Sequence, residues 1–347
     1  MTRSHSFKAK QPLLKVEGLK THFFVDGSVV RAVDRVDLEI FRGEVFGLVG
    51  ESGCGKTVTA LSIMGLIDEP GRIIEGDVIF DGISLGAITE DELNQIRGRR
   101  ISLIFQDPQA RLNPVFTVGS QLAEIFQVQY REPRQAAFER SVQLLHAVGI
   151  PDPQDRVHAY PHELSGGQAQ RVMIAMALAL EPELIIADEP TTALDVTIQA
   201  QILDLMRVMR KQHSTAILLI THDLGVIAGM ADRVAVMYAG QIVEQAYAGD
   251  LYNKPMHPYT LGLLASIPHS LDEGPLPSIP GSPPDPGNLP IGCRYAPRCE
   301  ARVEYDLKIC EVNSPSLHPP ALEHRVRCWL YESAPGHEPP LSSRDRG

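Results

Sequence analysis

The sequence predicts an α/β protein whose core is a largely parallel β-sheet with helices on its faces. Three observations lead to this fold class. A glycine-rich phosphate-loop pattern lies between an apolar strand and the start of a helix. Further short apolar runs, typical of buried strands, alternate downstream with segments of helical spacing. The chain of 347 residues is long enough for one large domain with an appendage, or for two domains.

The phosphate-loop pattern G-x-x-x-x-G-K-[ST] is matched by residues 50–57. An apolar strand is expected at Val45–Val49 and a helix start at Val58–Met64, which is the context that the motif requires. Glycines let successive N–H groups face phosphate oxygens, and the helix N-terminus adds partial positive charge. We expect Lys56 to reach the β- and γ-phosphates of ATP and Thr57 to bind Mg²⁺. The expected ATP-binding residues of this segment are Gly50, Glu51, Ser52, Gly53, Cys54, Gly55, Lys56, Thr57 and Val58.

The other elements follow from apolar runs and turn residues. Asp26-Gly27 predicts a hairpin turn, and Asp81-Gly82 predicts a turn. The stretch from about residue 90 to 160 is mostly helical in pattern, and Thr197–Lys211 predicts an amphipathic helix. Strands are predicted at Leu13–Val16, Val36–Ile40, Asp77–Asp81, Leu184–Ala187, Ala216–Ile220 and Arg233–Tyr238.

Two further motifs follow the phosphate loop. Leu164-Ser165-Gly166-Gly167-Gln168 opens an Ala/Met-rich helix, so its N–H groups form a second anion site. Asp188 and Glu189 directly follow an apolar strand, where a helix start or a plain turn is the weaker alternative. The three motifs, in this order, resemble the ATP-binding subunits of ABC transporters. This resemblance implies a mixed sheet core, an antiparallel β subdomain and a helical signature subdomain.

The resemblance also implies roles for individual residues. Asp188 would bind Mg²⁺, and Glu189 would polarise the attacking water as general base. Gln106 would contact the metal and the water, as well as the membrane subunit. His222 would contact the γ-phosphate, although a lone histidine is more often structural. Phe23 would stack on adenine, while its neighbour Phe24 leaves the choice of ring open and either ring could belong to the core.

The second anion site implies a dimer. In this family the motif Leu164, Ser165, Gly166, Gly167 and Gln168 closes over the γ-phosphate held by the opposite subunit, and the loop containing Asp195 crosses the interface. Two ATP molecules would therefore join two ATPase subunits. Hydrolysis of the two ATP molecules would remove the phosphate contacts that hold the subunits together, and this change would move a membrane partner between two states.

Several stretches resemble the oligopeptide/dipeptide (peptide and nickel) importer branch, in particular its D-type ATPase subunit. They are 105–108 with 112–114, His257-Pro258-Tyr259-Thr260 with 263–268, and Gly292–Cys299. The resemblance covers roughly residues 12–331. It implies two membrane permease subunits, a second homologous ATPase and an extracytoplasmic peptide-binding protein. The expected location is peripheral, on the cytoplasmic face of the inner membrane.

Composition divides the chain. We expect an ATP-binding domain at 12–267, with its helical subdomain at about 90–180. Prolines and glycines dominate from Pro268 to Pro290, which indicates an extended arm. The arm begins a C-terminal extension at 268–332, and a polar tail at 333–347 is expected to be disordered.

Four of the five cysteines lie in the extension with the spacing C-x5-C-x10-C-x17-C. Thiolate ligands suit zinc or an iron–sulfur cluster, and unligated thiols are a third alternative. The family resemblance favours a [4Fe–4S] cluster in a structural role. The fifth cysteine, Cys54, is interpreted as filling an exposed loop position, with a redox role less favoured. The four candidate ligands are Cys293, Cys299, Cys310 and Cys328.

The net charge of −11 argues against broad nucleic-acid binding through the phosphate backbone. No apolar stretch reaches the ~18 residues of a membrane span. The interpretation is therefore an ATPase subunit, with ATP and Mg²⁺, that powers import of di- or oligopeptides. The alternatives are an importer ATPase for nickel or another small solute, and a soluble ABC ATPase without a transport function.

Overall fold

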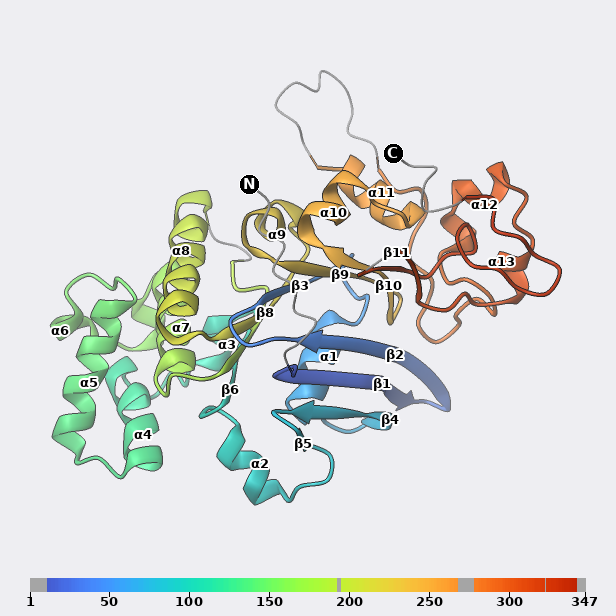
Figure 1. Ribbon diagram of the computed structural model, residues 1–347. Helices are drawn as coiled ribbons and strands as arrows, with labels where there is room; N and C mark the ends of the chain where they lie inside the picture. Colours follow the sequence, from blue (N-terminus) through green and yellow to red (C-terminus); the bar gives the residue numbers. More distant parts are fainter. Residues whose placement is uncertain (1–10, 192–194, 268–277, 322, 342–347) are drawn as a thin grey trace. The chain divides into compact units, whose positions relative to one another are not determined.

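The computed structural model describes residues 11–191, 195–267, 278–321 and 323–341 (Figure 1). Within these ranges the chain forms two compact units. The first contains the residues up to Phe41, 45–87 and those from Ile220 onward, and the second contains 42–44 and 88–219. The fold class predicted from the sequence is confirmed, because the chain combines parallel and antiparallel strands with helices.

An antiparallel sheet lies in the first unit. Its strands are β1 (Leu14–Val25), β2 (Ser28–Ile40), β4 (Gly71–Phe80) and β5 (Ile83–Ser84). The strand order is β2-β1-β4-β5, and both predicted turns are present, each joining two paired antiparallel strands. The φ angles of Asp26 and Gly27 are 49° and 77°, and those of Asp81 and Gly82 are 50° and 82°. A turn with two left-handed residues matches the twist of the two strands that it joins. It requires a positive φ at both positions, which Asp-Gly adopts readily.

The first unit contains a second set of strands. They are β3 (Val45–Val49), β9 (Arg233–Tyr238), β10 (Gln241–Tyr247), β11 (His318–Ala321) and β12 (His324–Val326). Their order is β11-β12-β10-β9-β3, with β3 parallel to β9. Strand β10 was not predicted, because polar residues interrupt its apolar pattern. One of them, Glu244, is fully buried and accepts hydrogen bonds from the N–H groups of Met256 and His257.

Four helices accompany these strands. They are α1 (Lys56–Ile63), α9 (Leu224–Met230), α10 (Ala248–Asn253) and α11 (Pro258–Ala265). His257 caps α11, since its Nδ1 accepts a hydrogen bond from the N–H of Tyr259 at 3.0 Å. Complete burial lowers the pKa of His257 to about 4, so the ring stays neutral and keeps the lone pair that the cap requires.

The second unit contains β6 (Ile101–Ile104) and β7 (Leu184–Asp188), and the chain leaves it within β8 (Ala216–Thr221). The strand order is β8-β7-β6, and β6 runs parallel to β7. The sequence predicted helices throughout the region of β6, because Ser102 interrupts its short apolar run. The helices are α2 (Glu90–Ile96), α3 (Pro108–Arg111), α4 (Val118–Tyr130), α5 (Arg134–Ala147), α6 (Pro153–Arg156), η1 (Pro161–Glu163), α7 (Gly166–Leu178) and α8 (Val196–His213).

The C-terminal region has its own small core in the first unit. Its helices are η2 (Ala296–Arg298), α12 (Glu300–Glu304) and α13 (Ile309–Val312). Leu307, Val326, Trp329 and Leu330 are buried together in a cluster that also contains Cys310 and Cys328. Residues 278–290 of the expected arm contain neither helix nor strand, whereas 268–277 lie outside the described residues.

The predicted tail begins with a tight turn. Ala334 and His337 exchange backbone hydrogen bonds of 3.1 and 2.9 Å, and the N–H of Leu341 donates to the carbonyl of Leu330. The last six positions of the tail, 342–347, are not among the described residues. Among the helices that the structure describes, none is both long and apolar enough to span a membrane.

Candidate functional site

The phosphate loop connects the buried strand β3 to helix α1, as the sequence predicted. Gly50 and Gly55 have φ angles of 155° and 107°, and both lie against backbone. A Cβ on Gly50 would lie 2.1 Å from the carbonyl oxygen of Met237. One on Gly55 would lie 2.2 Å from the carbonyl oxygen of Ala32. Only glycine therefore fits at these two positions, which explains the spacing of the motif physically.

Lys56 lies inside this loop. Its side chain is 5% exposed, and its Nζ donates to the carbonyl oxygens of Gly50 at 2.8 Å and Glu51 at 3.0 Å. The ammonium group is thus held by carbonyl oxygens of the same loop with which it is expected to bind phosphate. Thr57 and Val58 follow in the first turn of α1, and Thr57 is exposed.

Cys54 differs from the expectation of an exposed thiol. Its side chain is buried under the loop, 5% exposed, and a Cβ on Gly50 would approach its Sγ to 2.8 Å. Burial raises the pKa of the Cys54 thiol, although the nearby Lys56 opposes this shift. A buried, protonated thiol is a packing group, which argues against the redox role.

Gln106 and Glu189 meet in the second unit, although they lie 83 positions apart in the sequence. Their strands explain the contact: β6 and β7 are parallel, with Ile104 opposite Ala187, so the two residues leave the same ends of neighbouring strands. The Nε2 of Gln106 donates to the Oε2 of Glu189 at 3.0 Å. Asp188, the last residue of β7, is 4% exposed. This edge therefore presents two carboxylates and an amide, which are oxygen donors suited to Mg²⁺.

Glu189 has a left-handed backbone with φ of 47°. A non-glycine residue in this region carries a strain of about 1–2 kcal/mol. Such strain is retained where the surrounding structure determines it, and it occurs preferentially at functional positions. No feature of the sequence indicated it.

The glycine pair after Leu164 begins helix α7. Ser165 is its N-cap: the Oγ accepts from the N–H of Gln168 at 3.3 Å, and the Gln168 side chain accepts from the N–H of Ser165 at 3.1 Å. This capping box leaves Ser165 and Gly166 exposed at a helix start, while Gly167 is half-buried. The N–H groups of Gly166 and Gly167 can therefore face an anion from outside.

The remaining predicted site residues lie at the ends of elements. Asp195 caps α8, where its Oδ1 accepts from the N–H of Ile198 at 2.9 Å. Its neighbours 193 and 194 are outside the described residues. His222 is exposed and directly follows β8. Phe23 is half-buried with its ring close to Gly71, whereas Phe24 is 47% exposed, so the two rings differ in environment.

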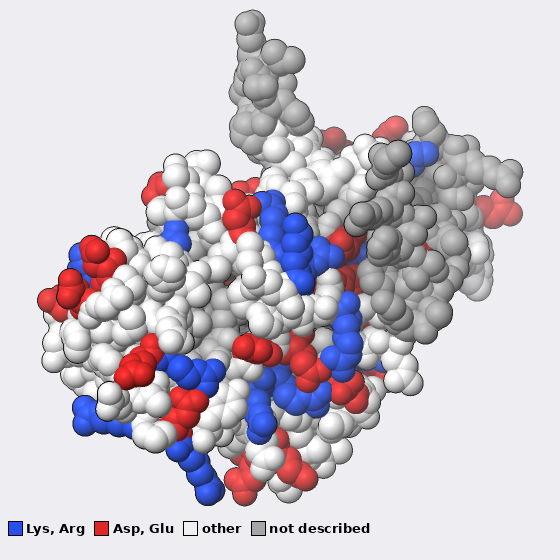
Figure 2. Space-filling view, turned by 60° about the vertical axis from the view of Figure 1, so that its left-hand side comes forward, with Lys and Arg blue, Asp and Glu red and all other residues white. Residues whose placement is uncertain are grey.

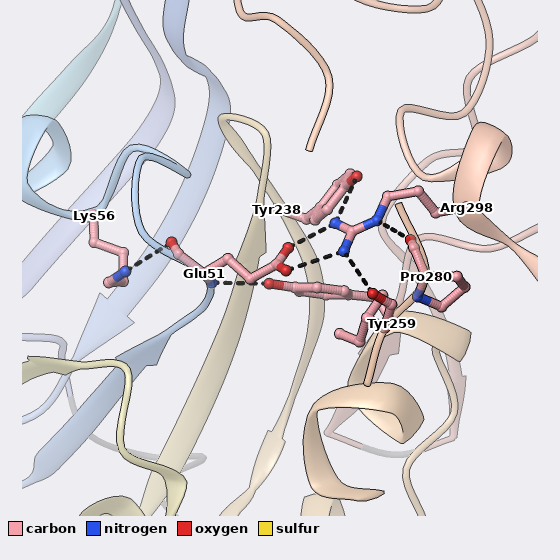
Figure 3. Close-up of polar contacts among 7 residues, drawn as sticks. Glu51, Lys56, Tyr238, Tyr259, Pro280 and Arg298 are labelled. Atoms are coloured by element: carbon pink, nitrogen blue, oxygen red, sulfur yellow. Dashed lines mark hydrogen bonds and ion pairs between the residues drawn. The ribbon is translucent and has the colours of Figure 1, made fainter. Parts of the chain in front are cut away.

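The phosphate loop is contacted by two residues, Tyr259 and Arg298, whose motifs were recognised in the sequence but to which no role was assigned. The carboxylate of Glu51 forms a two-point ion pair with Arg298, and the N–H of Glu51 donates to the Oη of Tyr259 at 2.9 Å (Figure 3). The sequence signal was their occurrence in the two C-terminal motifs. The contact itself spans 247 positions of sequence, so spacing alone could not show it.

The four C-terminal cysteines are free thiols, and three of them, Cys293, Cys310 and Cys328, belong to or pack against one small core. Burial raises the pKa of Cys293 to about 11 and that of Cys310 to about 12, and neighbouring cysteines add to both shifts. Burial also raises the pKa of Cys299 and Cys328. Even so, the described residues contain no group of three or more His, Cys, Asp or Glu side chains placed to hold a metal ion. The donor chemistry suits a soft metal, whereas the present positions do not form its site.

A glycine-lined loop with a buried lysine in the first unit and a carboxylate-ended strand in the second are each features of phosphate-loop ATPases of the ATP-binding cassette class. The family model described as "ABC transporter" matches residues 33–192, and the one described as "Oligopeptide/dipeptide transporter, C-terminal region" matches 243–305. The chain belongs to the family of oligopeptide/dipeptide ABC transporter ATP-binding proteins.

Relatives extend over almost the whole chain. The oligopeptide transport ATP-binding protein AppD of Bacillus subtilis is 50% identical, over 92% of this chain and 97% of its own length. The dipeptide transport ATP-binding protein DppD of Escherichia coli is 45% identical, over 91% and 96%. Among solved structures, the ATP-binding cassette MJ0796 in a dimeric, post-hydrolysis state bound to ADP and Pi is 28% identical with a TM-score of 0.62, covering 68% of this chain and 98% of its own.

Proposed function

We propose that this ATPase binds ATP with Mg²⁺ and uses its hydrolysis to power import of di- or oligopeptides across the cytoplasmic membrane. One observation carries the proposal: similarity to peptide-transport ATP-binding proteins spans the phosphate loop, the Gln106–Glu189 pair and the C-terminal region together. We further propose an ATP-binding domain at 12–267 followed by the C-terminal extension, and the C-terminal family match at 243–305 includes residues of both.

The site residues divide the work between binding and chemistry. Backbone N–H groups of 50–58 and the ammonium of Lys56 hold the phosphates, and Phe23 stacks on adenine. Thr57, Asp188 and Gln106 hold Mg²⁺, which neutralises phosphate charge when bound. Glu189 orients a water and accepts its proton, since its carboxylate is fixed by Gln106 at 3.0 Å. His222 contacts the γ-phosphate.

The exposed start of α7 completes the site of a second subunit. Leu164, Ser165, Gly166, Gly167 and Gln168 face the γ-phosphate bound by the partner, and Asp195 lies at the dimer interface. The dimeric state of the solved cassette bound to ADP and Pi supports this assembly. In this branch the partner ATPase is a related but distinct chain, which makes the pair a heterodimer.

The complete transporter contains two membrane permeases and an extracytoplasmic peptide-binding protein, so this chain is peripheral at the cytoplasmic face of the inner membrane. A nucleic-acid partner is not part of the proposal. The net charge is −11, and Lys and Arg are interspersed with Asp and Glu on the face drawn in Figure 2. Binding to the phosphate backbone favours basic surfaces instead.

Co-purification tests the function. The Glu189→Gln form should be isolated with ATP from detergent-solubilised membranes, since arrested hydrolysis holds the ATP-bound assembly together. Two multi-span proteins and a second ATPase are expected, and the associated binding protein identifies peptide, nickel or another solute as cargo. Recovery of ribosomal or DNA-associated proteins without any membrane protein would leave only the ATPase assignment standing.

The four cysteines are proposed to hold a [4Fe–4S] cluster that stabilises the extension, with zinc or free thiols as alternatives. The proposal is supported by the donor chemistry of the thiols and by the packing of three of them, Cys293, Cys310 and Cys328, in or against one core. Anaerobically purified protein is expected to be brown, with about four iron atoms per chain. Cys293→Ser should lose this iron, whereas Cys54→Ser should keep it. Colourless protein that contains zinc would overturn the cluster.

A further inference from the structure

We propose that Arg298 of the C-terminal extension and Tyr259 of α11 are positioning residues of the nucleotide site, which together hold the phosphate loop in its binding conformation. The inference rests on the proposed function in one respect, that the loop at 50–57 binds the nucleotide. Neither residue belongs to the phosphate-loop motif at 50–57. Both act through Glu51.

The ion pair between Arg298 and Glu51 has two points of contact. Nη1 lies 2.8 Å from Oε2, and Nη2 lies 3.1 Å from Oε1 (Figure 3). The side chains are 5% and 27% exposed, respectively. A planar guanidinium that faces a carboxylate in this way fixes direction as well as distance, and its limited exposure reduces screening by solvent.

The guanidinium is itself held in place. Its Nε donates to the carbonyl oxygen of Pro280 at 2.8 Å. The Arg298 Cζ atom lies 5.8 Å from the centroid of the Tyr238 ring, and Nη1 is 3.4 Å from the Tyr238 hydroxyl oxygen. The pair with Glu51 is the main reason that the pKa of Arg298 is raised. Lysine, a point charge without the fork, would not reproduce these contacts.

The backbone of Glu51 is held as well. Its N–H donates to the Tyr259 hydroxyl at 2.9 Å, and its carbonyl accepts from Lys56 Nζ at 3.0 Å. Tyr259 is fully buried and packs against Tyr238 and Tyr295, with ring centroids 4.6 and 5.5 Å away. Side chain, N–H and carbonyl of one loop residue thus all have partners. Two of these partners come from beyond residue 250, and the third is the phosphate-binding lysine.

This geometry predicts an effect on nucleotide affinity. A loop already held in its bound form loses less conformational entropy on binding than a free one. Without Arg298, the loop and Lys56 would become ordered only when the nucleotide binds, and the free-energy cost of this ordering would weaken nucleotide affinity. Because Arg298 directly precedes Cys299, the same contact joins the cysteine segment to the loop. The extension therefore acts on the nucleotide site through Glu51 of the phosphate loop.

A double-mutant cycle on MgADP affinity tests the inference with the full-length chain. Arg298→Met is expected to weaken MgADP binding by about tenfold, and Arg298→Lys by less. In a Glu51→Gln background, Arg298→Met should change affinity by less than about twofold. The matched control is Arg302→Met, which removes an arginine paired with Glu311 in the same segment. It should bind MgADP like the wild type.

Independent, multiplicative effects in the cycle would overturn the inference, as would wild-type affinity in Arg298→Met. If Arg298→Met does not fold, hydrogen exchange decides. Amides of 50–57 should exchange faster in Arg298→Lys than in Arg302→Lys, and equal rates would contradict the positioning role. Failure of the wild type to bind MgADP at all would instead contradict the proposed function.

Discussion

Glu189→Gln is expected to reduce steady-state ATP hydrolysis by about 10²–10⁴-fold, the range that a positioned general base contributes. Glutamine keeps the size of the side chain and an oxygen that can accept from Gln106 Nε2, now 3.0 Å from Oε2. It cannot take a proton from water. Binding should therefore survive while turnover does not, and the ATP-bound dimer should last longer.

Phosphate release at saturating ATP and retention of the dimer on size exclusion with ATP measure the two effects. Glu181→Gln is the matched control in the same unit, since its side chain is 66% exposed. It should hydrolyse ATP at the wild-type rate. Unchanged turnover in Glu189→Gln would remove Glu189 as the base and point to another group for proton transfer.

Local signals predicted the parts of the structure that depend on neighbouring residues. Both Asp-Gly turns need only two left-handed residues, and the strand before the phosphate loop needs only a continuous apolar run. Strand β6 was missed because Ser102 interrupts its short apolar run, and β10 was missed because buried Glu244 interrupts its apolar pattern. In β10 the tertiary structure supplies hydrogen bonds that the sequence does not display.

Contacts across long separations were beyond prediction. The sequence predicted Gln106 and Glu189 as site residues by resemblance, but their contact arises from the parallel register of β6 and β7. The Arg298–Glu51 pair depends on how the C-terminal region returns to the loop. Cys54 was misjudged for the same reason, because the residues that bury a loop position need not be its neighbours.

Gly55→Ala is expected to abolish most nucleotide binding, because the new methyl group would meet backbone. Its Cβ would lie 2.2 Å from the Ala32 carbonyl oxygen, at a φ of 107°. The left-handed backbone costs about 1–2 kcal/mol for an alanine, and overpacking adds about 1–3 kcal/mol. A strand carbonyl cannot rotate away as a side chain can. The loop must shift, and with it the N–H groups that face the phosphates.

Gly53→Ala separates the two causes within the same loop. Gly53 also has a left-handed φ, 76°, but an added Cβ would meet nothing within 4 Å. This variant should show only the conformational cost of about 1–2 kcal/mol in urea unfolding, and it should retain MgADP binding better than Gly55→Ala by about tenfold or more. Equal losses in the two variants would mean that backbone conformation alone governs the loop. A larger loss in Gly55→Ala would show that the close approach of strand β2 shapes the phosphate site.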